Sequence, residues 1–238
     1  MLIGGNFTND RDETKFNDQN SVVTLNGSAD QTISNSGFQE YFDYLYMNKP
    51  SGRLLLNDSI AIRNTLDLQS GVIYDTLPNT MVTILAAPGS AIDASNTSYV
   101  NGPVQKFGND DFTFPIGKSG FYRPCGLINN TGAATEAFKA EYFHANPEDS
   151  IGPLVQSTPF DHISHTEYWI IDRSVGTTAN AYVSLTWDSP ASGGVTDSTQ
   201  MSIAHWDGSN WQDAGPCERY GNTTTGEVTT TSIQSTFS

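Results

Sequence analysis

The chain has 238 residues, and its 26 acidic side chains outnumber its 11 lysines and arginines, which gives a formal net charge of -15 at pH 7. So acidic a chain, without a basic cluster, excludes nucleic acid and an anionic membrane surface as natural partners. No apolar run approaches the roughly 18–20 residues that span a bilayer, so the protein is not expected to be membrane-embedded. Only 16% of residues are charged, and Asn, Ser, Thr and Gly are abundant. This profile is typical of an all-β extracellular protein.

The first hundred residues carry an internal repeat. Ser51–Leu54 recurs as Ser70–Ile73, 19 residues later, and more loosely as Gly89–Ile92, while Val22–Ser28 echoes Leu54–Ser59. Apolar residues alternate within the copies, and a period of two indicates strands. Short strands at a near-constant spacing predict four to five coils of a parallel β-solenoid (β-helix) that begins near residue 5.

Two points in this half stay open. The aromatic stretch Tyr41–Met47 is expected to form an atypical coil or a lateral bulge that covers one end of the core. An antiparallel meander would show the same alternation, although two-residue hairpin signals are rare here, which favours the solenoid.

The second half follows a different pattern. We expect the solenoid to occupy residues 1–107 and a separate domain to occupy residues 108–238. Seven strands are predicted at 121–127, 136–144, 167–173, 181–187, 201–206, 211–214 and 227–233. This number and spacing favour an immunoglobulin-like β-sandwich. Trp206 and Trp211 flank a four-residue turn, so their indoles are expected to meet across a hairpin.

Four motifs carry a resemblance to a known group of proteins. They are Tyr99–Val104, Gly108–Gly117, Glu167–Trp169 with Asp172 and Arg173, and Trp206–Gly208 with Trp211. In this order they resemble a module of the large secreted and cell-surface proteins of Bacteroidota, in which β-solenoid coils precede an immunoglobulin-like domain. Such proteins are mostly described as adhesin-like and usually end in a sorting domain for type IX secretion.

The resemblance runs from Gly5 to the end of the chain and implies an extracellular or cell-surface location, but no particular activity. The sorting domain is absent from this sequence, which leaves the export route an inference. The start of the chain also lacks the basic and apolar regions of a signal peptide. We therefore expect the sequence to be a piece of a longer exported protein.

Catalytic constellations are not evident. None of the four histidines lies near a Gly-x-Ser-x-Gly motif. His162 and His165, with Asp161 and Glu167 nearby, are read as a solvated loop before a strand and not as metal ligands on a helix. The cations of the predicted solenoid are not paired with carboxylate clusters at the coil period, so a polysaccharide lyase ranks third among the hypotheses. We predict that the protein is not an enzyme.

Calcium is the one metal ion that the sequence suggests. Asn109, Asp110 and Asp111 lie at the predicted junction of the two domains, and their oxygens are ligands that Ca²⁺ prefers. The competing interpretation, which we favour, is an Asx turn that opens the next strand. Asp10, Asp12 and Asp18 form a weaker second candidate. No other cofactor is expected.

Cys125 and Cys217 lie 92 positions apart and leave two interpretations open. They are either two free thiols or one disulfide, which a secreted protein would favour. On the chain-entropy model a bridge over a loop of this size would stabilise the fold by about 4–5 kcal/mol.

Three Asp-Ser/Thr motifs match the O-glycosylation pattern of the resembled bacteria, which makes Ser59, Thr76 and Ser198 candidate sites. Each lies in a predicted turn, and turn chemistry explains the motifs equally well.

The leading functional hypothesis is a non-catalytic structural or adhesive module of a larger surface protein. Because end coils leave unpaired strand edges, self-association into a homo-oligomer or a filament is part of it. The second hypothesis is a carbohydrate-binding module that stacks surface glycans on exposed rings of Tyr41, Tyr44, Tyr46 and Trp211.

Overall fold

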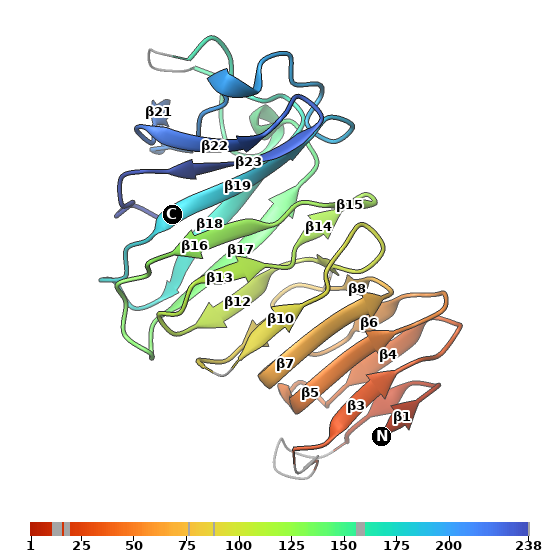
Figure 1. The fold of residues 1–238 in the computed structure, drawn as a ribbon. Helices are drawn as coiled ribbons and strands as arrows, with labels where there is room; N and C mark the ends of the chain where they lie inside the picture. Colours follow the sequence, from red (N-terminus) through yellow and green to blue (C-terminus); the bar gives the residue numbers. More distant parts are fainter. Residues whose placement is uncertain (11–15, 17–19, 76, 88, 156–159, 238) are drawn as a thin grey trace.

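The structure, a computed structural model, describes residues 1–10, 16, 20–75, 77–87, 89–155 and 160–237 (Figure 1). Regular structure in these ranges is β-strand apart from two 3-10 turns, η1 (Pro147–Asp149) and η2 (Ser198–Gln200). Neither turn is long or apolar enough to cross a bilayer. The all-β prediction is confirmed.

The N-terminal half is a parallel β-solenoid of about four turns. Its first sheet contains β1 (Leu2–Ile3), β3 (Val22–Leu25), β5 (Glu40–Asn48), β7 (Ile60–Ser70), β9 (Val82–Ile84) and β12 (Val104–Phe107). Its second sheet contains β2 (Phe7–Thr8), β4 (Gln31–Ser34), β6 (Leu54–Leu56), β8 (Ile73–Tyr74) and β11 (Val100–Asn101). Neighbouring strands in both sheets pair in parallel. The solenoid prediction is therefore confirmed, and the antiparallel alternative is wrong.

Apolar ladders hold the coils in register. Val23 pairs with Leu45, which pairs with Leu66, and all three side chains are fully buried. The next inward position repeats this with Leu25, Met47 and Leu68. Each buried aliphatic side chain contributes about 1.5–3 kcal/mol from the hydrophobic effect, and a shift by one residue would turn the whole inward row toward solvent.

The repeat found in the sequence is confirmed at one step and wrong at two others. Leu54 pairs with Ile73, which is the 19-residue echo. Val22–Leu25, by contrast, lies in the first sheet and Leu54–Leu56 in the second, so the echo of the 22–28 segment does not mark equivalent positions. The loose third copy forms β10 (Ser90–Ile92), which pairs with β7 instead of β8. The turns differ from coil to coil, so the coils differ in length. Similar turn sequences therefore do not mark equivalent positions in successive coils.

The solenoid starts earlier than predicted, at β1, and its aromatic stretch is not an end cover. Tyr41–Met47 lies inside β5, which pairs with β3 on one side and β7 on the other. A register shift between Phe42 and Tyr44 does interrupt the β5–β7 ladder. The expected irregularity is therefore a bulge within a central strand.

The first sheet continues past the predicted boundary at residues 107/108. Strand β12 pairs in parallel with β9 and antiparallel with β17 (Ala137–Phe143), which in turn pairs antiparallel with β18 (Tyr168–Val175). One hydrogen-bonded sheet thus runs from the first coil into the C-terminal half (Figure 1). The two halves also share one hydrophobic core cluster.

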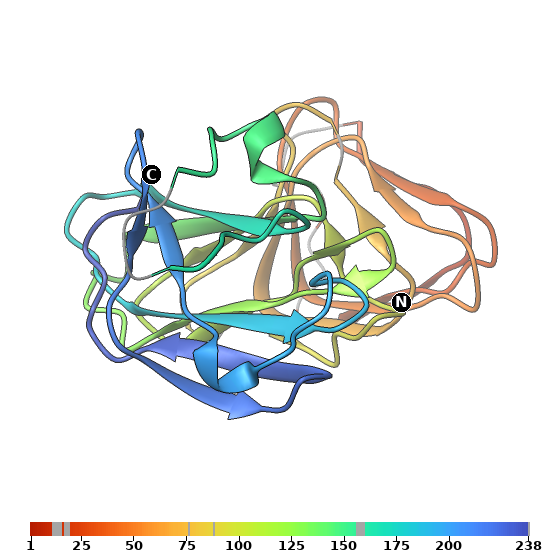
Figure 2. The ribbon, with the colours of Figure 1, turned by 90° about the horizontal axis from the view of Figure 1, so that it is seen from above.

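A five-stranded antiparallel sheet forms a second layer in the C-terminal half (Figure 2). In order it contains β13 (Phe112–Phe114), β16 (Cys125–Ile128), β19 (Tyr182–Asp188), β23 (Thr225–Thr230) and β22 (Cys217–Gly221). Two small hairpins complete the half, β14 (Gly117–Lys118) with β15 (Phe121–Tyr122), and β20 (Ala204–Trp206) with β21 (Trp211–Asp213). All seven predicted segments contain strand, while β22 was missed because Glu218–Tyr220 is exposed and lacks apolar alternation.

Candidate functional site

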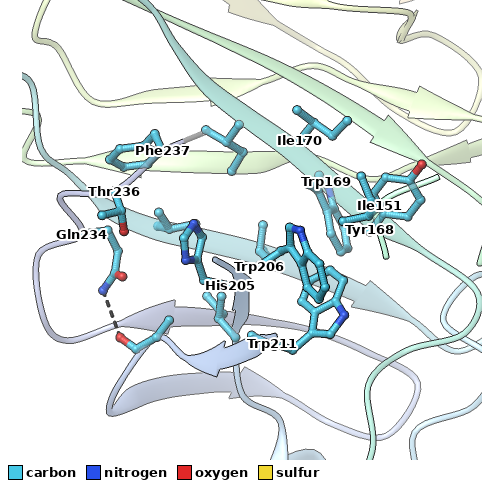
Figure 3. Close-up of a pocket in the computed structure, with 16 residues that line it drawn as sticks. Ile151, Tyr168, Trp169, Ile170, His205, Trp206, Trp211, Gln234, Thr236 and Phe237 are labelled. Carbon is cyan, nitrogen blue, oxygen red and sulfur yellow. Dashed lines mark hydrogen bonds between the residues drawn. The ribbon is translucent and has the colours of Figure 1, made fainter. Parts of the chain in front are cut away.

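A half-open cavity of about 190 Å³ lies in the C-terminal half, between β18 and the β20–β21 hairpin (Figure 3). It is lined by Ile151, Tyr168, Trp169, Ile170, Ile171, Val183, Leu185, Ile203, Ala204, His205, Trp206, Trp211, Ala214, Gln234, Thr236 and Phe237. None of these lining residues is an Asp, Glu, Lys or Arg. The cavity therefore offers hydrophobic contact and ring stacking in place of a charged recognition site.

The hairpin brings two of the indoles to the cavity wall. The Asp207 carboxylate accepts hydrogen bonds from the backbone N–H groups of Ser209 and Asn210, each at 2.8 Å, and this fixes the tight turn. Trp206 and Trp211 then lie opposite each other, with ring centroids 5.4 Å apart. The predicted cross-hairpin contact is confirmed. Trp211 is only 7% exposed, so it is wrong as an exposed platform for glycans.

A buried ion pair positions the third indole. Arg123 donates to both carboxylate oxygens of Glu167 at 2.7 and 2.9 Å, and the Tyr142 hydroxyl donates to the same carboxylate at 2.9 Å. The Arg123 backbone carbonyl accepts from Trp169 Nε1 at 3.0 Å. Arg123 is 1% and Glu167 6% exposed. Sequence reasoning did not single out Arg123, although a cation amid apolar strand residues was an available signal.

His205 and Tyr168 are the titratable side chains among the residues that line the cavity. His205 Nε2 is buried and has no hydrogen-bond partner among the residues that the structure describes. Burial lowers the pKa of His205, an effect that nearby Asp207 partly opposes. The lowered pKa favours the neutral imidazole, which adds a polar edge to a mostly apolar wall.

The three tyrosines predicted to bind glycans share one strand and one face. Tyr41, Tyr44 and Tyr46 are half-buried on β5, opposite the buried side chains of Phe42, Leu45 and Met47. The Arg63 guanidinium lies over the Tyr41 ring, 4.8 Å from its centroid. The bulge after Phe42 keeps Tyr41 on the same face as Tyr44 and Tyr46.

The calcium candidate lies just after β12. Asp110 and Asp111 are exposed. The Asp111 carboxylate accepts from the Asn129 backbone N–H at 2.7 Å, and Asp110 lies 3.5 Å from Lys106 Nζ. Among the described residues, no cluster of three or more His, Cys, Asp or Glu could hold a metal ion. Calcium binding by Asn109, Asp110 and Asp111 stays a prediction, and Asp12 and Asp18 of the weaker candidate lie outside the described residues.

The two cysteines are free thiols. Cys125 lies on β16 and Cys217 on β22, with β19 and β23 between them. Three strand spacings amount to about 14 Å, whereas a disulfide joins Cα atoms within about 7 Å. Of the two interpretations left open by the sequence, the structure therefore shows free thiols, and the disulfide candidate is wrong. Burial raises the pKa of both thiols.

The remaining candidates lie at separate places. Ser59 is half-buried, and its hydroxyl accepts from the Met81 backbone N–H at 3.1 Å. Ser198 begins η2, after the capping residue Asp197. Thr76 lies outside the described residues. His162 and His165 are both exposed, as expected for a loop.

The described cations of the solenoid are engaged in structural contacts. Lys49 is 2% exposed, and its ammonium donates to the carbonyls of Gly27 and Ala29 at 2.8 and 2.9 Å and to Gln31. Arg53 pairs with Asp30 at 2.6 Å. Arg63 and Lys106 pair with acids as well.

A scan against protein-family models finds no match to this chain, and searches of curated proteins and of solved structures find no significant similarity. The geometry of the fold and of its sites is therefore the basis for the functional assignment.

Proposed function

We propose that this protein is a non-catalytic structural and adhesive module of a larger secreted or cell-surface protein, with a short β-solenoid followed by an immunoglobulin-like sandwich. One observation carries the proposal: a single hydrogen-bonded sheet passes through both halves without a linker. The eight strands of its main path, about 4.8 Å apart, extend over about 34 Å. Such a body suits a rigid spacer, because a hinge would require a break in the sheet.

Unfolding experiments test this rigidity. A rod whose halves share a sheet and a core should unfold in one cooperative transition, with matching midpoints by calorimetry and by denaturant. Probes in each half, such as Tyr44 in the solenoid and Trp187 in the sandwich, should report the same midpoint. Two separate transitions would show independent domains on a flexible joint and would contradict the spacer role.

Self-association at the first coil belongs to the same proposal. The outer edges of β1 and β2 pair with no other described strand, and Met1 and Leu2 are 55% and 72% exposed. Unpaired ladder groups beside apolar side chains favour coil-on-coil contact with another molecule. Analytical ultracentrifugation should show a concentration-dependent oligomer, and Leu2→Lys should return it to monomer. A monomer at every concentration would remove this part of the proposal.

Glycan binding on β5 is the second candidate function, favoured by the tyrosine row. Three rings on one face of a strand can stack against successive sugars. A glycan array should give signals that Tyr44→Ala and Tyr46→Ala abolish. Tyr220→Ala, which removes a 63% exposed ring elsewhere, is the matched control. Signals that survive the β5 variants would place any binding at another surface.

A lyase activity is the least supported alternative, because the described solenoid cations already have partners. Incubation with acidic polysaccharides should release no unsaturated products. Their appearance would overturn the non-catalytic assignment.

A further inference from the structure

The cavity runs along two strand edges. Four consecutive residues of β18, Tyr168–Ile171, line it, and so do four consecutive residues at β20, Ile203–Trp206. Successive side chains of a strand point to opposite faces, so a cavity that lies on one face meets only alternate residues. Contact with four consecutive residues therefore indicates that the cavity adjoins the edge of β18, and likewise the edge of β20 with Ile203 just before it.

Both edges offer backbone hydrogen-bonding groups. Among the described strands, β18 pairs only with β17, and β20 pairs only with β21. Within the described part of the chain, no backbone hydrogen bond outside these ladders involves Tyr168–Val175. Alternate N–H and C=O groups of an edge strand point away from its partner and are free to pair. In the described structure, the edges of β18 and β20 on either side of the gap therefore both have unpaired backbone N–H and C=O groups.

We propose that the gap between β18 and β20 accepts an extended peptide segment, which adds to the edge of β18 and places one large apolar side chain in the cavity. Main-chain hydrogen bonds to a sheet edge, with a pocket for an alternate side chain, are the two elements of β-strand addition. A cavity of about 190 Å³ suits one aromatic side chain, since an engineered cavity of about 150 Å³ holds benzene.

The residues that line the cavity limit which peptide side chains can bind there. Trp169, Trp206 and Trp211 favour an aromatic or large aliphatic side chain, while the absence of a lining Lys or Arg gives an acidic residue no partner. The net charge of -15 also disfavours an acidic segment. A sugar fits less well, because the lining offers few polar groups for its hydroxyls. The partner is therefore a neutral or basic segment with alternating apolar residues.

Selection from a phage-displayed library of seven-residue peptides tests this inference. The expected result is enrichment of peptides with apolar residues at alternate positions and one aromatic residue among them. Ala204→Leu places a larger side chain in the cavity wall and should weaken binding of the selected peptide at least tenfold. Ala134→Leu makes the same change at an exposed position and should bind as the wild type does.

Two further measurements do not depend on a protein variant. N-methylation of the selected peptide at one set of alternate amides should reduce binding at least tenfold, because those amides pair with β18. Amide NMR signals of residues 168–171 and 203–206 should shift on titration. No enrichment, equal binding to Ala204→Leu, unaffected binding after N-methylation, or shifts confined to other regions would each overturn the proposal. If the protein is a rigid spacer that binds no peptide, these binding tests will be negative while unfolding still occurs in one transition, so the two proposals can fail separately.

Discussion

The two halves of the molecule build their cores in different ways. In the solenoid, aliphatic residues of similar size stack at the same register in successive coils, as Val23, Leu45 and Leu66 do. In the C-terminal half, large rings and a buried ion pair come together from distant strands, as Arg123 and Glu167 do across 44 positions. The repeat specifies the solenoid core within short segments. The core of the C-terminal half depends instead on contacts between residues that lie far apart in the sequence.

The largest predicted effect falls on the ion pair of the C-terminal half. Arg123→Leu leaves the Glu167 carboxylate buried without its cation, which should lower the free energy of unfolding by about 4–5 kcal/mol. Urea denaturation measures the change. Arg53→Leu removes a cation whose partner Asp30 is solvent-exposed and should cause little change. Equal losses for the two variants would mean that burial does not determine how much each ion pair contributes to the free energy of unfolding.

A slightly smaller loss is expected in the solenoid ladder. Leu45→Ala opens a cavity in the middle of the Val23–Leu45–Leu66 row and should cost about 3–4 kcal/mol in the same assay. Leu77→Ala, at a 47% exposed site, is the control and should change stability little. A loss below about 1 kcal/mol for Leu45→Ala would show that neighbouring coils collapse into the space.

Asp75 makes the stability of the protein depend on pH. It is 4% exposed in the turn after β8, and burial raises its pKa from 3.8 to about 6, against a hydrogen bond from Thr80 and with a further contribution from Glu141. The folded state therefore binds more protons than the unfolded state between pH 4 and 6, so this group makes stability fall as pH rises through that window.

Asp75→Asn should remove that slope. The difference in unfolding free energy between pH 4 and pH 7 should change by about 2–3 kcal/mol relative to the wild type. Asp149→Asn, at an exposed position in η1, should leave the pH profile as it is. An unchanged profile for Asp75→Asn would show that Asp75 is solvated in the native protein.

The smallest effect concerns the thiols. Because Cys125 and Cys217 are not bonded, a reductant should shift neither the melting temperature nor the intact mass. A thiol reagent should label half-buried Cys217 well before buried Cys125. A mass gain of two hydrogens on reduction would instead reveal a bridge.

Periodicity could predict the solenoid because its evidence lies within a few residues, such as alternating Leu54 and Leu56. It could not assign strands to sheets, since Val22–Leu25 and Leu54–Leu56 look alike and belong to different sheets. The Trp206–Trp211 contact was predictable because a four-residue turn separates the two indoles. The cavity was not predictable, because its walls come from β18, β20 and the chain near Phe237, which lie far apart in sequence.

Strand β12 has a consequence for assembly. Its parallel side continues the coils and its antiparallel side begins the second half, so among the described strands the parallel stack has its unpaired edges at β1 and β2. Assembly through the first coil alone has a stoichiometric limit, because two molecules that meet there cover each other's unpaired edges and leave none for a third. Coil-on-coil contact thus produces closed pairs, and a longer chain of molecules needs a second, chemically different junction.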